Sequence, residues 1–350
     1  MLGGVGLGGP RLWIAGGSDR AKYRAVDRWV VDSGGEGWEL LTTRFELVVR
    51  KVAVGKSRVV VDGPSNLGLR PPEAGTVPGC YKLAGAVRDQ GFLSRIGAED
   101  AGCVTPPRYD RGDWKPGDGV FNAEAMASYS GKLADRVGKL VDDGKFVVLL
   151  GGECSNLLGP TLALKRRGRY GVAYLDGHSD FRTVDNDAHV GAAGGEALAL
   201  VTGRGQADLT DLEDLSPYVR DEDAVMLGYR EDEAYLESLR EAGIPDWSAL
   251  AIIDDPAGAA DGVLRHLERD DLDGFWVHLD VDILDAEVMP AVDSPDPGGL
   301  QHEHLRQLLK PILASPKCVG FDIGIFDPDL DPDGRYAAEL TDTLVAVLTD

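Results

Sequence analysis

The chain has 350 residues, 43% of them hydrophobic, enough for one large globular domain or two smaller ones. Its formal net charge of −23 argues against partners such as nucleic-acid backbones or anionic membranes, which attract Lys- and Arg-rich surfaces. The sequence shows no membrane-length apolar run, no signal-peptide pattern and no paired or zinc-knuckle spacing of its four cysteines. We therefore expect a cytoplasmic protein without nucleic-acid or membrane partners.

Residues 1–57 differ from the rest of the chain. They hold glycine clusters and one strand-like segment, Phe45–Val49. We predict an N-terminal extension, or a poorly ordered segment, ahead of a single domain over residues 58–350.

From residue 58 onward, apolar strands alternate with helices. The predicted strands are 59–61, 145–150, 170–175, 224–228, 250–253, 275–280 and 318–323. The predicted helices are 79–96, 123–142, 156–167, 195–202, 231–242, 257–269 and 335–348. Continuous apolar strands separated by helices indicate an α/β fold with a parallel sheet covered on both faces. In such a fold the functional site lies at the carboxyl ends of the strands.

Two acidic clusters lie at such strand ends. The first contains Asp176, His178 and Asp180, and the second contains Asp280 and Asp282. In an extended segment, residues two apart share a face, so each cluster should point its side chains in one direction. Four carboxylates and an imidazole would repel one another unless cations lay among them. This pattern predicts a metal site, and more naturally a two-metal than a one-metal site.

A third polar strand end, Gly151–Ser155, follows strand 145–150. Together with segments 176–180 and 280–282 and the Pro-Gly-rich loop 289–299, it resembles the arginase/agmatinase (ureohydrolase) family of binuclear manganese hydrolases. The resemblance covers about residue 58 to the end. It implies a three-layer α/β/α sandwich with a mostly parallel sheet, and a homo-oligomer that is a trimer or hexamer.

The resemblance also implies a ligand set for two divalent metal ions, expected to be Mn2+. Its members would be Cys154, Asp176, His178, Asp180, Asp280 and Asp282. Asp176 and Asp280 would bridge the ions, and a metal-bridging hydroxide would attack a planar C–N carbon. Asp180 would orient that hydroxide and relay its proton. The resemblance thus implies a small-molecule substrate and hydrolysis of a C–N bond in a guanidino or amidino compound.

The first departure from the family pattern is Cys154, where most members have a ligand histidine. A thiolate adds negative charge, and sulfur suits Fe, Co or Zn better than Mn2+. Two other interpretations stay open. The thiol would only pack at a helix start, or it would act as a nucleophile activated by the helix N-terminus.

The second departure is a missing proton-shuttle histidine, because the matching stretch Gly191–Gly195 has none. His189 lies nearby and is the candidate, against the alternative of a solvated loop histidine. The third departure is Ile325, which takes the place of a guanidinium-binding glutamate. Strand alternation points Asp322 to the opposite face, so it is no simple substitute.

Arg182 and Glu233 are the candidates for substrate contacts. A guanidinium fork suits a substrate carboxylate, and Glu233 lies roughly where the family binds an α-amino group. Ordinary surface charges are the alternative for both. Two further functions stay open: hydrolysis of a formimino, amide or hydroxyguanidine group on the same fold, and metal or ligand binding without catalysis.

Overall fold

The computed structural model describes residues 29–32, 37–43, 46–52, 56–187 and 190–349. The chain divides into two compact units, Met1–Lys56 and Ser57–Asp350. In the first unit the described residues form an antiparallel sheet of β1 (Trp29–Asp32), β2 (Gly37–Thr43) and β3 (Glu46–Val52). The predicted strand at 45–49 overlaps β3, with Phe45 outside the described residues. Strands β1 and β2 were missed, since such short segments between glycines show little periodicity.

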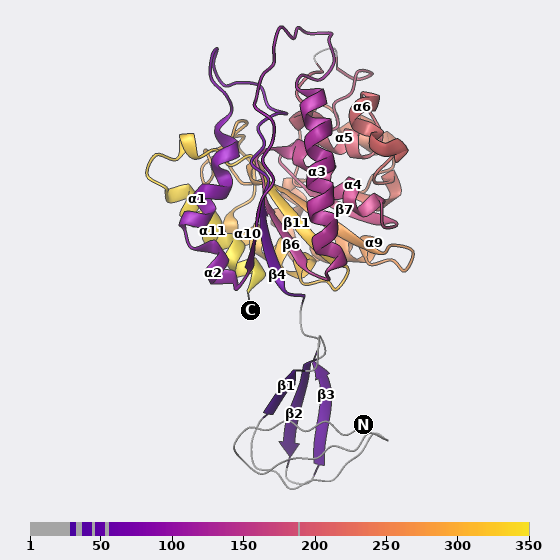
Figure 1. Cartoon of the computed structure of the whole chain (residues 1–350), viewed down its shortest axis with the longest axis vertical. Helices are drawn as coiled ribbons and strands as arrows, with labels where there is room; N and C mark the ends of the chain where they lie inside the picture. The colour runs from indigo at the N-terminus through magenta and orange to yellow at the C-terminus, as the bar shows by residue number, and fades with distance from the viewer. Residues whose placement is uncertain (1–28, 33–36, 44–45, 53–55, 188–189, 350) are drawn as a thin grey trace. The chain divides into compact units, whose positions relative to one another are not determined.

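The second unit is built around a parallel sheet, drawn in Figure 1. Within the described residues its eight strands pair in the order β5-β4-β6-β11-β10-β7-β8-β9, and all neighbours are parallel. The strands are β4 (Arg58–Asp62), β5 (Glu99–Cys103), β6 (Phe146–Leu150), β7 (Tyr170–Leu175), β8 (Ala224–Leu227), β9 (Asp246–Trp247), β10 (Gly274–Asp280) and β11 (Cys318–Gly324). Every residue of β6, β10 and β11 is buried, as expected for strands covered on both faces.

Helices cover both faces of this sheet (Figure 1). One layer contains α3 (Ala123–Asp142), α4 (Leu158–Lys165), α5 (Ala197–Val201) and α6 (Ala207–Thr210). The other contains α1 (Leu83–Asp89), α2 (Phe92–Ile96), α8 (Ala249–Asp254), α9 (Pro256–Leu267), α10 (His302–Leu313) and α11 (Arg335–Leu348). The predicted three-layer sandwich is confirmed. No helix in the described ranges is long and apolar enough to cross a membrane.

The register brings several strand ends to one edge of the sheet. Leu279 of β10 pairs with Leu175 of β7 on one side and with Ile323 of β11 on the other. Ile323 in turn pairs with Leu150 of β6. The segments that follow these four strands therefore begin next to one another. This is the carboxyl edge at which the sequence places its acidic clusters.

The strand predicted at 250–253 is wrong, because this segment is helix α8. Ser248 caps it, and its hydroxyl accepts a hydrogen bond from the Ala251 N–H at 3.3 Å. Ala249 and Ile252 are buried while Leu250 is exposed, which is the three-residue spacing of a helix face. The strand here is the two-residue β9. The helix predicted at 231–242 shortens to α7 (Leu236–Glu241).

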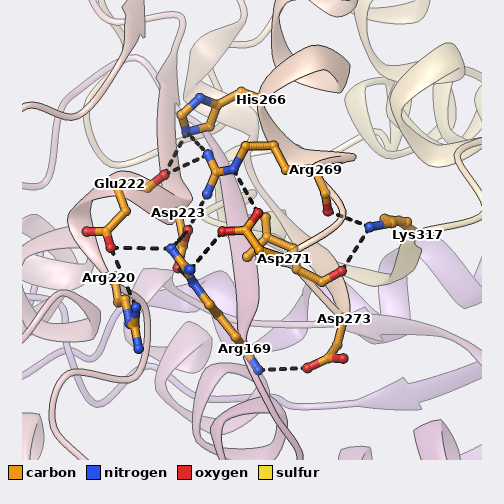
Figure 2. Close-up of polar contacts among 10 residues, drawn as sticks. Arg169, Arg220, Glu222, Asp223, His266, Arg269, Asp271, Asp273 and Lys317 are labelled. Atoms are coloured by element: carbon orange, nitrogen blue, oxygen red, sulfur yellow. Dashed lines mark hydrogen bonds and ion pairs between the residues drawn. The ribbon is translucent and has the colours of Figure 1, made fainter.

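Charged residues occupy the opposite, amino edge of the sheet (Figure 2). Arg169, Asp223 and Asp273 directly precede β7, β8 and β10. The buried Asp223 carboxylate accepts hydrogen bonds from Arg169 at 2.7 and 2.8 Å and a further one from Arg269. Arg169 also donates to Asp271 at 2.8 Å and, through its backbone N–H, to Asp273 at 2.9 Å. We call these five residues the amino-edge network, in which the two guanidinium groups pair with Asp223 and Asp271.

Candidate metal centre

The six predicted ligands lie together at the carboxyl edge, and we call them the acidic cluster. Cys154 opens the short 3-10 helix after β6, and Asp176, His178 and Asp180 lie in the loop after β7. Asp280 ends β10, and Asp282 lies in the 3-10 helix Val281–Ile283. All are buried except His178, whose side chain is 30% exposed.

One half of the acidic cluster surrounds the Cys154 thiol. Its Sγ donates a hydrogen bond to Asp280 Oδ2 at 2.9 Å. Ligand atoms of Cys154, Asp176 and His278 all lie within 4.8 Å of one another. Asp176 Oδ2 is buried and has no hydrogen-bond partner among the described residues. Sulfur, carboxylate oxygen and imidazole nitrogen therefore meet at one buried point.

The other half surrounds the His178 imidazole. Nδ1 lies 2.9 Å from Asp282 Oδ2 and 3.7 Å from Asp176 Oδ1, and Nε2 lies 3.1 Å from Asp296 Oδ2. Ligand atoms of Asp176, His178 and Asp282 also lie within 4.8 Å of one another. Asp176 belongs to both groups. It is therefore placed to bridge two cations.

The loops reach this arrangement by turns, and the predicted extended alternation is wrong beyond the strand ends. Asp180 has a left-handed φ of 44°, and Asp282 lies in a 3-10 helix. The backbone N–H of His178 donates to Asp176 Oδ1 at 2.7 Å, and that of Asp282 donates to Asp280 Oδ1 at 2.8 Å. Such Asx turns bring residues two apart to one side without a strand.

Burial and mutual repulsion dominate the electrostatics of the acidic cluster. Burial, together with the charge of Asp282, raises the pKa of Asp176 to about 7. Burial and neighbouring carboxylates raise the pKa values of Asp180 and Asp280 well above the usual range. Burial is the largest influence on Asp282 and would raise its pKa, but the hydrogen bond and charge of His178 and the hydrogen bond from the Gly177 N–H together outweigh burial and lower that pKa.

Among the described residues, no lysine or arginine side chain forms an ion pair with the four carboxylates of the acidic cluster. Buried carboxylates without a counter-charge are costly, so a bound cation would relieve them. Carboxylate oxygens with imidazole and thiol are ordinary ligands of first-row transition metals. The residues present therefore fit a metal centre.

Asp180 is the predicted proton relay and lies beside the rest of the acidic cluster. The Tyr174 hydroxyl donates a short hydrogen bond to its Oδ2. The Tyr174 ring in turn stacks on the His278 imidazole, with ring centroids 4.5 Å apart and planes at 24°. The buried Tyr174 of β7 thus fixes Oδ2 of Asp180. His189, the other predicted catalytic residue, lies outside the described residues.

The two predicted substrate contacts meet around Tyr235. Arg182 Nε lies 3.2 Å from the Tyr235 hydroxyl and 3.2 Å from Asp187 Oδ2, and its guanidinium packs on the Tyr235 ring at 5.2 Å. Glu233 accepts hydrogen bonds from Ser179 Oγ at 2.8 Å and from the Tyr235 N–H at 3.3 Å. Ser179 lies within the ligand loop itself. Both charged groups therefore border the acidic cluster.

Three residues of this region were not predicted from the sequence. His278 was missed as a possible ligand, although its place two residues before Asp280 puts both on one strand face. Arg230 donates to the backbone carbonyls of Asp282 and Leu284 at 2.8 and 3.1 Å, which anchors the second ligand loop. Burial raises the pKa of Glu196 to about 7, and no motif marked this residue.

These features define an α/β/α protein with a buried candidate metal centre at the carboxyl edge of a parallel sheet. The sequence model of the Arginase family matches residues 81–349, and the chain belongs to this family. The predicted family is thus confirmed. The family is metal-dependent, and its members are hydrolases that act on C–N bonds.

Individual relatives agree with this assignment. The arginase of Bacillus subtilis is 26% identical over 300 residues, covering 83% of this chain and 98% of the relative. The formimidoylglutamase of Aeromonas hydrophila is 28% identical over 290 residues, covering 76% and 85%. The solved structure of Bacillus caldovelox arginase superposes with a TM-score of 0.76 at 24% identity, covering 84% of this chain and 99% of that one. This structural likeness supports the fold.

Proposed function

We propose that this chain is a hydrolase that binds two divalent metal ions in the acidic cluster and cleaves a C–N bond of an amidino or guanidino compound. The observation that carries the proposal is the pair of overlapping ligand groups that share Asp176. A single cation would leave one of the two groups uncompensated. Two cations would balance four carboxylates in a member of a metal-dependent family.

When held by the acidic cluster, divalent ions would supply Lewis-acid activation of water near neutral pH. The chain's own residues would hold and move the proton. Tyr174 fixes Oδ2 of Asp180, so Oδ1 is the oxygen that would accept it. Asp180 would then return this proton to the leaving nitrogen as the C–N bond breaks.

The side chains bordering the acidic cluster favour a substrate that carries a carboxylate. Arg182 presents a partly exposed guanidinium, 27% exposed, held by Tyr235 and Asp187. Its planar fork suits a carboxylate. Glu233 would bind an amino group of the same substrate. We propose both roles for a substrate that is a small amino-acid derivative, with its amidino group over the metal centre.

A second candidate substrate is a formimino compound, and Ile325 favours it. This residue follows β11, is 3% exposed and donates its backbone N–H to the Gly152 carbonyl at 2.7 Å. Its φ of 76° is unusual for a β-branched side chain, so the position is held against strain. An apolar side chain here offers no carboxylate to a guanidinium. A formimino group has one nitrogen fewer than a guanidino group, so it needs fewer polar contacts from the protein.

The test is a turnover assay on protein stripped with a chelator and reloaded with Mn2+, Fe2+, Co2+ or Zn2+. Hydrolysis of a guanidino compound releases urea and an amine, whereas hydrolysis of a formimino compound releases formamide and an amine. We expect turnover of either guanidino or formimino compounds, and we expect it only in the metal-loaded protein. Two bound ions without turnover of guanidino acids, guanidino amines, formimino acids or amides would refute the proposal and indicate a binding protein.

A further inference from the structure

His278 is a buried histidine that lies in one of the two candidate ligand groups but is not among the six residues of the acidic cluster. It lies in β10, two residues before Asp280, so both side chains emerge from the same face of the sheet. The residue is 0% exposed. Its imidazole therefore faces the acidic cluster from beneath, along the strand.

Three neighbours fix the orientation of this imidazole. Nδ1 lies 2.6 Å from Asp322 Oδ2, and Asp322 Oδ1 accepts a hydrogen bond from Trp276 Nε1 at 2.6 Å. The Tyr174 ring stacks on the imidazole face. Because a carboxylate accepts hydrogen bonds, we assign the proton of the neutral imidazole to Nδ1, which leaves the lone pair on Nε2.

That lone pair has no partner of its own. Within the described ranges, neither His278 Nε2 nor Asp176 Oδ2 forms a hydrogen bond, although both atoms are buried. Both belong to the group whose ligand atoms, with that of Cys154, lie within 4.8 Å of one another. An unsatisfied buried polar atom destabilises the fold, and two of them converge here beside a thiol.

We propose that His278 is a metal ligand, which binds one of the ions through Nε2 together with Cys154 and Asp176. Asp322 then has the role of the carboxylate that orients a ligating imidazole from its far side. Binding by sulfur breaks the Sγ–H bond of Cys154 and releases one proton to solvent. A nitrogen, sulfur and oxygen donor set favours Zn2+, Co2+ or Fe2+ over Mn2+. The inference rests on the proposed function only in that the acidic cluster binds metal.

The test is titration of chelator-stripped protein with Co2+, followed by optical absorption and metal analysis. Wild type should bind two equivalents and develop a sulfur-to-cobalt charge-transfer band. His278→Asn should lower the Co2+ affinity of the sulfur site by at least about 100-fold, and Asp322→Asn by about 10- to 100-fold. Cys154→Ser should abolish the band.

His302→Asn is the matched control. His302 also has a buried Nε2 without a partner among the described residues, and its Nδ1 contacts the Thr343 hydroxyl at 2.9 Å. No thiol or carboxylate cluster surrounds it within the described part of the chain. This variant should bind two equivalents with the wild-type spectrum. Two equivalents and an unchanged spectrum in His278→Asn would overturn the inference.

A second measurement serves if His278→Asn does not fold. In wild type with 15N-labelled histidine, Zn2+ should shift the Nε2 resonance of one histidine whose Nδ1 is protonated, and the shift should persist in His178→Asn. Loss of every histidine response in His178→Asn would overturn the inference. Metal binding through His278 without turnover would instead refute the proposed function and leave this inference standing.

Discussion

The two edges of the same sheet treat buried acids in opposite ways. At the amino edge, Asp223 is fully buried and has two guanidinium partners, Arg169 and Arg269. At the carboxyl edge, Asp176 and Asp280 are as deeply buried, and among the described residues no lysine or arginine pairs with them. Asp223 at the first edge is compensated as folded, whereas at the second edge the described ion pairs give Asp176 only the His178 imidazole and give Asp280 no cationic partner. Burial of an acid therefore does not indicate a site; burial without a counter-charge does.

The largest expected difference between the edges concerns turnover. Asp280→Asn removes a carboxylate from the acidic cluster, so kcat of the metal-loaded enzyme should fall by at least about 10³-fold, more than loss of a supporting residue costs. Asp223→Asn makes the same chemical change at the amino edge and should leave kcat of the folded protein within about threefold of wild type. Steady-state assays at saturating metal would measure both. A kcat for Asp280→Asn within tenfold of wild type would break the comparison.

The next effect concerns stability at the amino edge. Asp223→Asn leaves two arginines without their buried partner and should lower the free energy of unfolding by about 3 kcal/mol. Asp271→Asn is the control in the same network, because the Asp271 side chain is 52% exposed. It should cost less than about 1 kcal/mol. Urea unfolding followed by circular dichroism would measure both, and equal losses would show that burial does not set the strength of this network.

At the carboxyl edge, loss of an acid is expected to raise the free energy of unfolding when a chelator keeps metal away. This effect is smaller than the loss at the amino edge and opposite in sign. Burial and neighbouring acids raise the pKa of Asp280, so the folded protein holds a proton that the unfolded chain releases above its ordinary pKa. The contribution of Asp280 to stability should therefore fall as the pH rises from acid to neutral, and Asp280→Asn should gain about 1–2 kcal/mol at pH 7.

The matched control for this gain is Asp282→Asn. Because His178 lowers the pKa of Asp282, its ionised form stabilises the fold above the unfolded pKa. This variant should lose stability at pH 7 and differ little from wild type in acid. Urea unfolding with chelator, in acid and at pH 7, would show whether Asp280→Asn gains stability and Asp282→Asn loses it. Destabilisation by Asp280→Asn at pH 7 would contradict the argument from uncompensated charge.

The smallest expected effect on stability concerns the Tyr174 hydroxyl. This neutral group donates a hydrogen bond to Asp180, whereas at the amino edge guanidinium groups donate to the buried acid. Tyr174→Phe removes one hydrogen bond and keeps the ring against His278, so it should cost about 1 kcal/mol of stability. Tyr170→Phe, at the amino end of the same strand, should cost less than about 0.5 kcal/mol. Thermal unfolding of metal-free protein would resolve the pair, and equal costs would remove Tyr174 from the site.

Much of the fold and the site could be predicted from local patterns. Strands such as Phe146–Leu150 are apolar throughout and end in polar motifs, so the sheet and its carboxyl edge were readable. The amphipathic pattern of α3 gave both of its ends. Strand β5 was missed because it lies at the sheet edge, where its polar residues face solvent and leave no apolar run.

Long-range contacts account for what could not be predicted. No pattern near Asp322 shows that it contacts a histidine on β10, since only the parallel pairing of β10 with β11 brings the two together. Arg230 looks like an ordinary charged loop residue, yet it binds carbonyls more than fifty residues away in sequence. Such contacts depend on strand order, which one sequence does not reveal.

The Asx turns at Asp176 and Asp280 have a consequence for how the centre assembles. Each turn closes within three residues, so its hydrogen bond is local and needs no contact with the other strands. The parallel pairing of β6, β11, β10 and β7 is non-local, and burial of the apolar core favours it. We therefore expect closure of the sheet to bring the candidate ligands together before any metal ion is bound.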